Sequence, residues 1–152
     1  MIDQRTKQLY QELLMDHNKN PRNFRVMDPA THEAVGHNPF CGDKLVVYLD
    51  VGDDNTVNDV SFIGEGCAIS KASASMMTTF VKGKSIEQVE KLFHQFHDLA
   101  TGKIDPDSDE HELGRLKVFA GVRDLPARVK CATLAWHTVD AATKGEKQIS
   151  TE

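Results

Sequence analysis

A short loop ahead of a predicted hairpin sets the strongest limit on how this chain can fold. The loop runs from Asn38 to Asp43 and reads Asn-Pro-Phe-Cys-Gly-Asp. In an extended backbone, residues i and i+2 point the same way, so Cys41 and Asp43 can face one target. Gly42 permits a positive φ angle at no steric cost, and Pro39 stiffens the approach. The loop is therefore expected to present a thiol and a carboxylate together.

Two segments after this loop are predicted to pair as antiparallel strands. In Lys44–Val51, every second residue from Leu45 to Val51 is apolar. Val57–Ile63 is predicted to be the returning strand, after a Gly-Asp-Asp-Asn turn. A weaker strand is predicted at Glu33–His37. Cys67 follows the second strand of the hairpin almost directly, so the hairpin should bring Cys67 close to the loop that contains Cys41.

The remaining elements are predicted to be helices. Apolar residues three to four positions apart indicate a helix over residues 2–18. Ser85 and Gln88 form a capping-box pattern, and Pro126 occupies the favoured first position of a last helix. The further predicted helices span residues 67–81, 86–100, 113–122 and 126–144. The length indicates a single domain over residues 1–145, followed by a flexible tail at 146–152.

Composition narrows the function classes. The formal net charge is −5, from 18 Lys and Arg against 23 Asp and Glu residues, which argues against nucleic acid and anionic membrane as partners. The first ten residues lack the apolar core of a signal peptide, and no stretch is long enough to span a bilayer, so a cytoplasmic location is expected. Three cysteines in such a chain favour metal or thiol chemistry over disulfides. The alternative is that they are small buried apolar residues.

Three thiols and one carboxylate, from Cys41, Cys67, Cys131 and Asp43, match the number of ligands in a tetrahedral zinc site. Three thiolates and a carboxylate exceed the charge of Zn²⁺, so a nearby cation is expected. Arg128 lies three residues before Cys131, on the same helical face, and is the candidate; Lys130 and Arg123 are further possibilities. One oxygen ligand among sulfurs forms a weaker bond, which suits sulfur transfer or a transient iron–sulfur cluster.

Three motifs together make the chain resemble the IscU/SufU family of iron–sulfur cluster assembly proteins. They are Asn38–Asp43, Gly64–Ser70 and Arg128–Trp136, and the stretch His17–Asn23 also fits. The resemblance covers nearly the whole chain. It implies an α+β fold in which a small antiparallel sheet of about three strands packs against several helices. It also implies that the three cysteines and Asp43 bind zinc or a cluster.

Within this family the chain is more similar to the SufU branch, because it has an extra segment around Gly114–Asp124 and Lys130, not a histidine, before the last cysteine. The resemblance implies a sulfurtransferase-like, zinc-dependent acceptor that takes persulfide sulfur from a SufS-type cysteine desulfurase on Cys41. Downstream assembly factors or apoproteins would receive the sulfur. Two alternatives remain. One is a scaffold on which Cys41, Cys67 and Cys131 hold a transient [2Fe–2S] cluster that passes to apoproteins, and the other is a zinc-stabilised interaction domain without chemistry.

Overall fold

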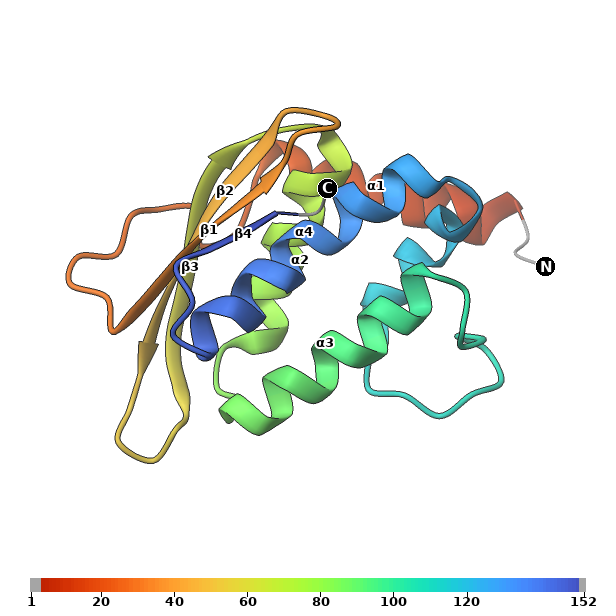
Figure 1. Ribbon diagram of the computed structural model, residues 1–152. Helices are drawn as coiled ribbons and strands as arrows, with labels where there is room; N and C mark the ends of the chain where they lie inside the picture. Colours follow the sequence, from red (N-terminus) through yellow and green to blue (C-terminus); the bar gives the residue numbers. More distant parts are fainter. Residues whose placement is uncertain (1–3, 151–152) are drawn as a thin grey trace.

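A mixed β-sheet forms one side of the molecule, and helices pack against its inner face (Figure 1). The computed structural model describes residues 4–150. In chain order, the elements within that range are α1 (Gln4–Lys19), β1 (His32–Asn38), β2 (Asp43–Val51), β3 (Val57–Glu65), α2 (Ala68–Val81), α3 (Ile86–Ala100), the 3₁₀ helix η1 (Gly114–Asp124), α4 (Pro126–Thr143) and β4 (Gln148–Ser150). None of these helices is both long and apolar enough to cross a membrane.

The register of the sheet places both ends of the hairpin at one edge of the molecule. The strand order is β3-β2-β1-β4, with β2 antiparallel to both β1 and β3 and with β4 parallel to β1. Asn38 pairs with Asp43 where β1 turns into β2, and Lys44 pairs with Glu65 at the end of β3. The loop before the hairpin and the segment that enters α2 therefore meet at the same end of the sheet.

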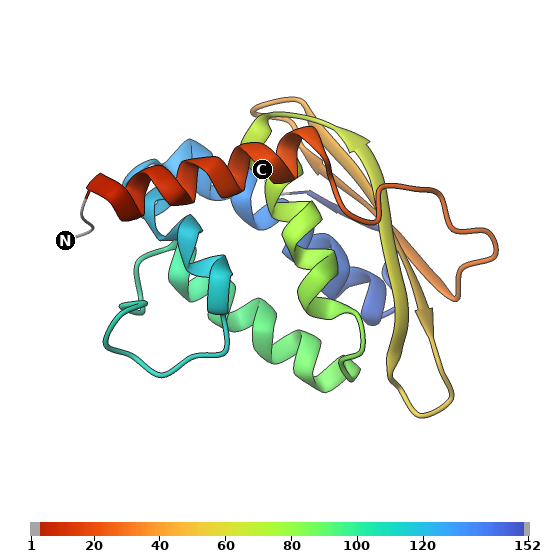
Figure 2. The ribbon, with the colours of Figure 1, turned by 180° about the vertical axis from the view of Figure 1, so that it is seen from behind.

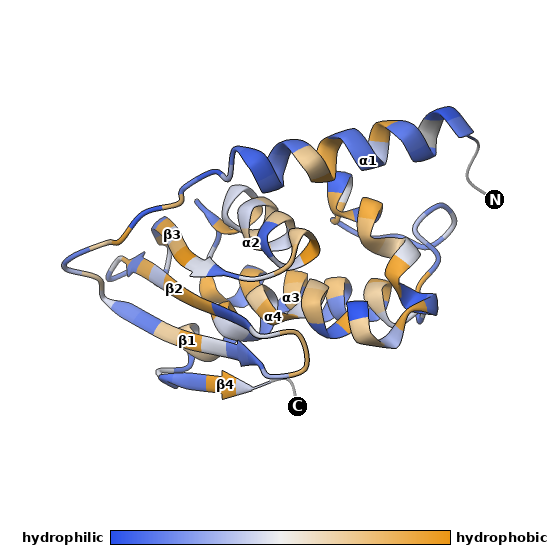
Figure 3. Cartoon of the chain, turned by 90° about the horizontal axis from the view of Figure 1, so that it is seen from above, coloured by the Kyte–Doolittle hydropathy of each residue, from blue (hydrophilic) through white to orange (hydrophobic). Residues whose placement is uncertain are grey.

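The core lies between the sheet and the helices. α4 packs against β1 and β2, and α2 packs against β3. α1 lies against α2, and α3 lies against α4. Figure 2, which views the molecule from behind, shows α1 lying across the helical layer. Figure 3 shows apolar residues concentrated where these layers meet. Trp136 of α4 is fully buried and stacks on Phe96 of α3, with ring centroids 4.9 Å apart. This stack packs the middle of α4 against α3, while α4 also packs against β1 and β2.

The structure confirms the predicted α+β class and each of the three predicted strands. It also confirms the capping box of α3, in which Ser85 and Gln88 bond reciprocally, and the first-position proline of α4. The predicted start of the first helix at Ile2 lies outside the described residues. The helix predicted at residues 113–122 is a 3₁₀ helix, in a segment with glycines at 114 and 121 that weaken an α-helix.

The structure contains a short strand that the sequence did not predict, within the segment 146–152 that was expected to be a tail. Residues 148–150 form strand β4, which pairs with Val35, Gly36 and His37 of β1. The backbone N–H of Val35 donates to the carbonyl of Lys147 at 2.8 Å, and Ile149 packs against the core. A three-residue strand with one apolar side chain leaves too short a pattern to be recognised in the sequence.

Candidate metal centre

Two thiols and one carboxylate meet at the end of the sheet. Cys41 lies in the tight turn between β1 and β2, Asp43 is the first residue of β2, and Cys131 lies in the second turn of α4. Their ligand atoms, two Sγ and one carboxylate oxygen, all lie within 4.8 Å of one another. The two sulfurs are 3.3 Å apart. The structure thus brings together three of the four predicted ligands from residues far apart in the sequence.

Cys67, the fourth predicted ligand, borders this group without belonging to it. It is the N-cap of α2, where its Sγ accepts a hydrogen bond from the backbone N–H of Ser70 at 3.4 Å. Its own backbone N–H donates to Asp43 Oδ1 at 2.8 Å. The N-cap position places the Cys67 sulfur beside the unpaired backbone N–H groups at the start of α2. Cys67 as a ligand remains a prediction.

The three thiols differ in exposure. Cys41 is exposed, Cys67 is half-buried and Cys131 is fully buried. Burial raises the pKa of the Cys131 thiol, and hydrogen bonds with Cys41 and Cys67 together with the charge of Asp43 raise it further. A bound cation would offset this cost, since ligation replaces the proton. The donor set of sulfurs and one oxygen, gathered around a buried thiol, therefore fits a zinc ion or an iron–sulfur cluster.

Gly66 leaves the space that the Asp43 carboxylate occupies. A Cβ atom at Gly66 would collide with Oδ1 of Asp43, and would lie 3.0 Å from its Cγ. Asp43 is fully buried, so its side chain has no room to move aside. The Gly-Glu-Gly sequence before Cys67 thus allows the end of β3 to pass close beside the carboxylate.

We predict that Gly66→Ala will disturb Asp43 and lower stability by about 1–3 kcal/mol, as overpacking of a tight interior does. Gly121→Ala is the matched control for loss of backbone freedom, because Gly121, like Gly66, has no positive φ, but has open space where its Cβ would lie. Denaturant unfolding and metal content measured on both variants test this. Stability and metal content of Gly66→Ala equal to those of Gly121→Ala would contradict the prediction.

Of the three cations considered from the sequence, only Arg128 faces the thiols. A hydrogen bond with Cys131, followed by the charges of Cys67 and the other thiols, raises the pKa of Arg128. Lys130 instead places its Nζ over the ring of Phe40, 5.4 Å from the centroid. The role considered for Arg123 is wrong. Its side chain packs beside Gly102, away from the thiols, because the 3₁₀ helix η1 lies against α3.

Asn38 is a site residue whose role the sequence did not reveal. It is fully buried, and its side-chain amide contacts both Asp43 and Cys131. The available signal was its position, since an asparagine ahead of a tight turn commonly bonds to the backbone two residues later.

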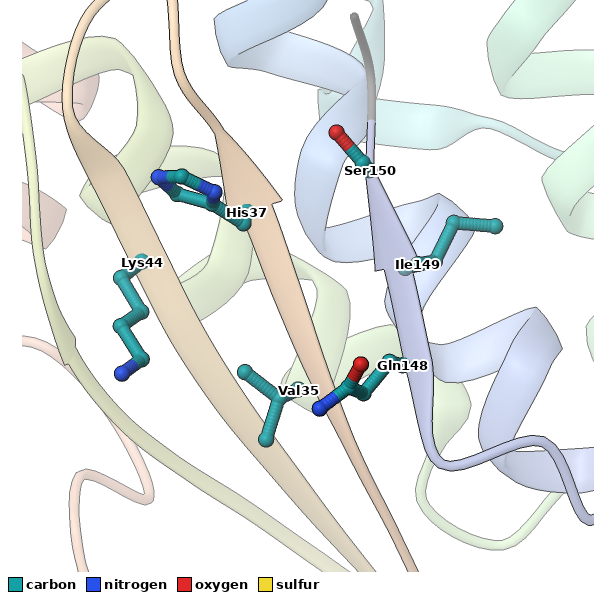
Figure 4. Close-up of a pocket in the computed structure, with 6 residues that line it drawn as sticks. All are labelled: Val35, His37, Lys44, Gln148, Ile149 and Ser150. Atoms are coloured by element: carbon teal, nitrogen blue, oxygen red, sulfur yellow. The ribbon is translucent and has the colours of Figure 1, made fainter.

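The outer face of the sheet carries a separate hollow of about 520 Å³, shown in Figure 4. Its lining residues come from β1, β2 and β4 and are Val35, His37, Lys44, Gln148, Ile149 and Ser150. In Figure 4, Gln148 extends toward Val35, whereas Ile149 points the opposite way, as successive strand residues do. The predicted metal ligands do not line this hollow, so it is distinct from the thiol cluster.

Comparison with known proteins places this site in a family. Residues 9–132 match the family described as the NifU-like N-terminal domain. The chain belongs to this family. The NifU-like match spans Cys41, Asp43, Cys67 and Cys131, so it covers the whole candidate centre.

Several relatives share this NifU-like domain over almost their full length. The chain is 42% identical over 139 residues to the zinc-dependent sulfurtransferase SufU of Bacillus subtilis, covering 91% of this chain and 92% of that protein. It is 40% identical to the iron-sulfur cluster assembly scaffold protein IscU of Streptococcus pyogenes, covering 90% of this chain and 83% of that protein. A solved SUF-system scaffold protein from Fervidobacterium islandicum superimposes with a TM-score of 0.78 at 28% identity, covering 91% of this chain and 98% of that one.

Proposed function

We propose that this protein acts in iron–sulfur cluster assembly as a zinc-dependent sulfur acceptor, and that it takes persulfide sulfur from a cysteine desulfurase of the SufS type. The observation that carries this proposal is the difference in solvent exposure between the neighbouring thiols of Cys41 and Cys131. Cys41 is exposed in a turn, while Cys131, 3.3 Å away, is buried in a helix. An acceptor needs one thiol that an incoming partner can reach and others that stay in place. The similarity to a zinc-dependent sulfurtransferase supports the same assignment.

The transfer requires no external oxidant or reductant. The thiolate of Cys41 attacks the outer sulfur of the persulfide on the desulfurase cysteine. A new S–S bond forms to Cys41 as the S–S bond within the donor breaks, and the donor cysteine leaves as a thiolate. The sulfane sulfur keeps its oxidation state, so electrons balance within the exchange. Downstream assembly factors or apoproteins would then accept this sulfur.

Cys41, Asp43, Cys67 and Cys131 would hold the zinc ion. Zinc, when bound, keeps its cysteine ligands deprotonated without redox chemistry of its own. Gly42 has a φ of +73° and open space where a Cβ would lie, so we expect that the turn can carry Cys41 outward without displacing a helix or strand. Asp43 and Cys131 are buried and lie on regular elements, which suits ligands that remain in place.

Arg128 is proposed to offset the excess negative charge of the centre. We expect Arg128→Ala to slow sulfur transfer by roughly tenfold, a typical loss for residues that support a metal's ligands. Lys144→Ala is the matched control, because Lys144 also bears a positive charge on the α4 region but bonds to Asp140, at the far end of the helix. The measurement is the rate of desulfurase-dependent sulfur uptake by each variant. Equal rates would show that Arg128 is ordinary surface charge.

The alternative function is a scaffold on which a transient [2Fe–2S] cluster is built as cargo. It is favoured by the similarity to the scaffold protein IscU of Streptococcus pyogenes and by the same sulfur-rich ligand set. The two functions are separated by incubating metal-free protein with iron, sulfide and a thiol reductant. A sulfur acceptor should form no stable cluster absorbance under conditions in which it binds zinc, whereas a scaffold should form the cluster and transfer it to an apoferredoxin.

A further inference from the structure

Asn38 connects three parts of the candidate centre through one buried side chain. Its Nδ2 donates to Asp43 Oδ2 at 3.2 Å and to Cys131 Sγ at 3.7 Å. Its Oδ1 accepts from the backbone N–H of Phe40 at 3.2 Å, and its backbone carbonyl accepts from the N–H of Cys41 at 3.3 Å. The side chain is fully buried, so these partners are not exchanged for water.

The contacts determine which way the amide faces. A carboxamide has one acceptor oxygen and two N–H donors. The backbone N–H of Phe40 can only donate, so it requires the oxygen on its side. Both N–H groups then face the carboxylate of Asp43 and the sulfur of Cys131. These are the two buried groups that carry negative charge when a cation is bound between them.

Asn38 bonds to Cys41 through the backbone, whereas it bonds to Asp43 and Cys131 through its side chain. The hydrogen bonds described for it hold its backbone to the Asn38 carbonyl, and its Sγ to Cys131 only. Charge-assisted hydrogen bonds stabilise anionic ligands and fix their orientation. In the hydrogen bonds described, the Asn38 side chain therefore holds Asp43 and Cys131 directly and does not hold the thiol of Cys41.

We propose that Asn38 is the positioning residue that retains zinc in the protein while Cys41 is away from the metal, an inference that rests on the proposed zinc-dependent sulfur transfer. Its two N–H donors keep Asp43 and Cys131 oriented and reduce the repulsion between their charges. The remaining ligands then bind the ion tightly enough to prevent its loss. A residue that only shaped the turn would act through Cys41 instead.

This difference can be measured as zinc affinity in two backgrounds. Asn38→Ala is made in the unaltered chain and in Cys41→Ala, and the zinc dissociation constant is obtained by competition with a chromogenic chelator. We expect Asn38→Ala to weaken zinc binding by about 10- to 100-fold in both backgrounds, the usual cost of removing a partner of a metal ligand. Asn58→Ala is the control, because Asn58 is an exposed strand residue of the same type; it should change affinity less than twofold.

Asn38→Ser provides a second variant in case Asn38→Ala does not fold. A serine hydroxyl can still accept from the backbone N–H of Phe40, as serine commonly does ahead of a turn, but is too short to reach Asp43 and Cys131. It should weaken zinc binding as Asn38→Ala does. An effect of Asn38→Ala that disappears in the Cys41→Ala background would overturn the inference, as would affinities within twofold in both backgrounds. An unaltered chain that binds no zinc would instead overturn the proposed function together with the inference.

Discussion

Replacing Cys131 with serine is expected to leave the purified protein with less than about a tenth of the zinc bound by the unaltered chain. Cys131 is fully buried, and its sulfur lies within 4.8 Å of ligand atoms of both Cys41 and Asp43. Its removal is expected to weaken zinc binding by orders of magnitude, because Cys131 is one of the ligands proposed to stay on the ion when Cys41 leaves it. The binding free energy of a structural-type ion adds to folding, so the melting temperature should fall by roughly 10 °C.

Elemental analysis and thermal melts of the two proteins test this expectation. Thr133→Ala is the control, because Thr133 is also buried near the start of α4 but bonds to the Val129 carbonyl within the helix. It should keep its zinc. Chelation should lower the melting temperature of the unaltered chain and leave that of Cys131→Ser unchanged. Full zinc content in Cys131→Ser would show that Cys131 is not a ligand.

Replacing Cys41 with alanine is expected to reduce desulfurase-dependent sulfur uptake at least about 100-fold, as loss of an attacking nucleophile does. The variant should fold normally, because Cys41 is exposed and its backbone bond to Asn38 does not need the thiol. Phe40→Ala is the matched control. Phe40 is the neighbouring residue and is 74% exposed, yet it offers no nucleophile, so this variant should still accept one sulfur at the end point.

The measurement is the amount of sulfur bound per chain after incubation with desulfurase and cysteine. Cys41→Ala should also retain measurable zinc, since the three other predicted ligands, Asp43, Cys67 and Cys131, remain and Asn38 still bonds to two of them. Uptake in Cys41→Ala equal to that of the unaltered chain would assign the acceptor to another thiol. Circular dichroism and a melting curve of Cys41→Ala check that the variant is folded, so that a loss of sulfur uptake is not caused by unfolding.

Local chemistry made most of the site predictable from the sequence. Cys41 and Asp43 were expected to face one target as residues i and i+2 of an extended backbone; they do come together, but across a turn in which Gly42 has a φ of +73°. The position of Cys67 at the start of a helix followed from the Gly-Glu-Gly break before it. That Cys131 would join them was inferred from the number of ligands and then supported by the family resemblance, since the packing of α4 on β1 and β2 has no local signature.

The parts that the sequence did not reveal all depend on contacts between distant segments. The amide of Asn38 reaches Cys131, which lies 93 positions away. The clearance at Gly66 matters only because β3 ends beside the carboxylate of Asp43. Strand β4 forms because β1 offers a free edge to a three-residue segment. In each case the residue type allows many roles, and tertiary packing selects one.

Cys41 is proposed as the thiol that receives sulfur, and mass spectrometry of the sulfur-loaded protein can locate that sulfur. The zinc-loaded protein is incubated with a cysteine desulfurase and cysteine, without reductant, and is then digested and sequenced by mass spectrometry. We predict an added mass of about 32 units, one sulfur atom, on the peptide that contains Cys41. Added mass found mainly on the Cys131 peptide would contradict Cys41 as the acceptor. No added mass, together with a stable cluster formed from iron and sulfide, would also contradict it.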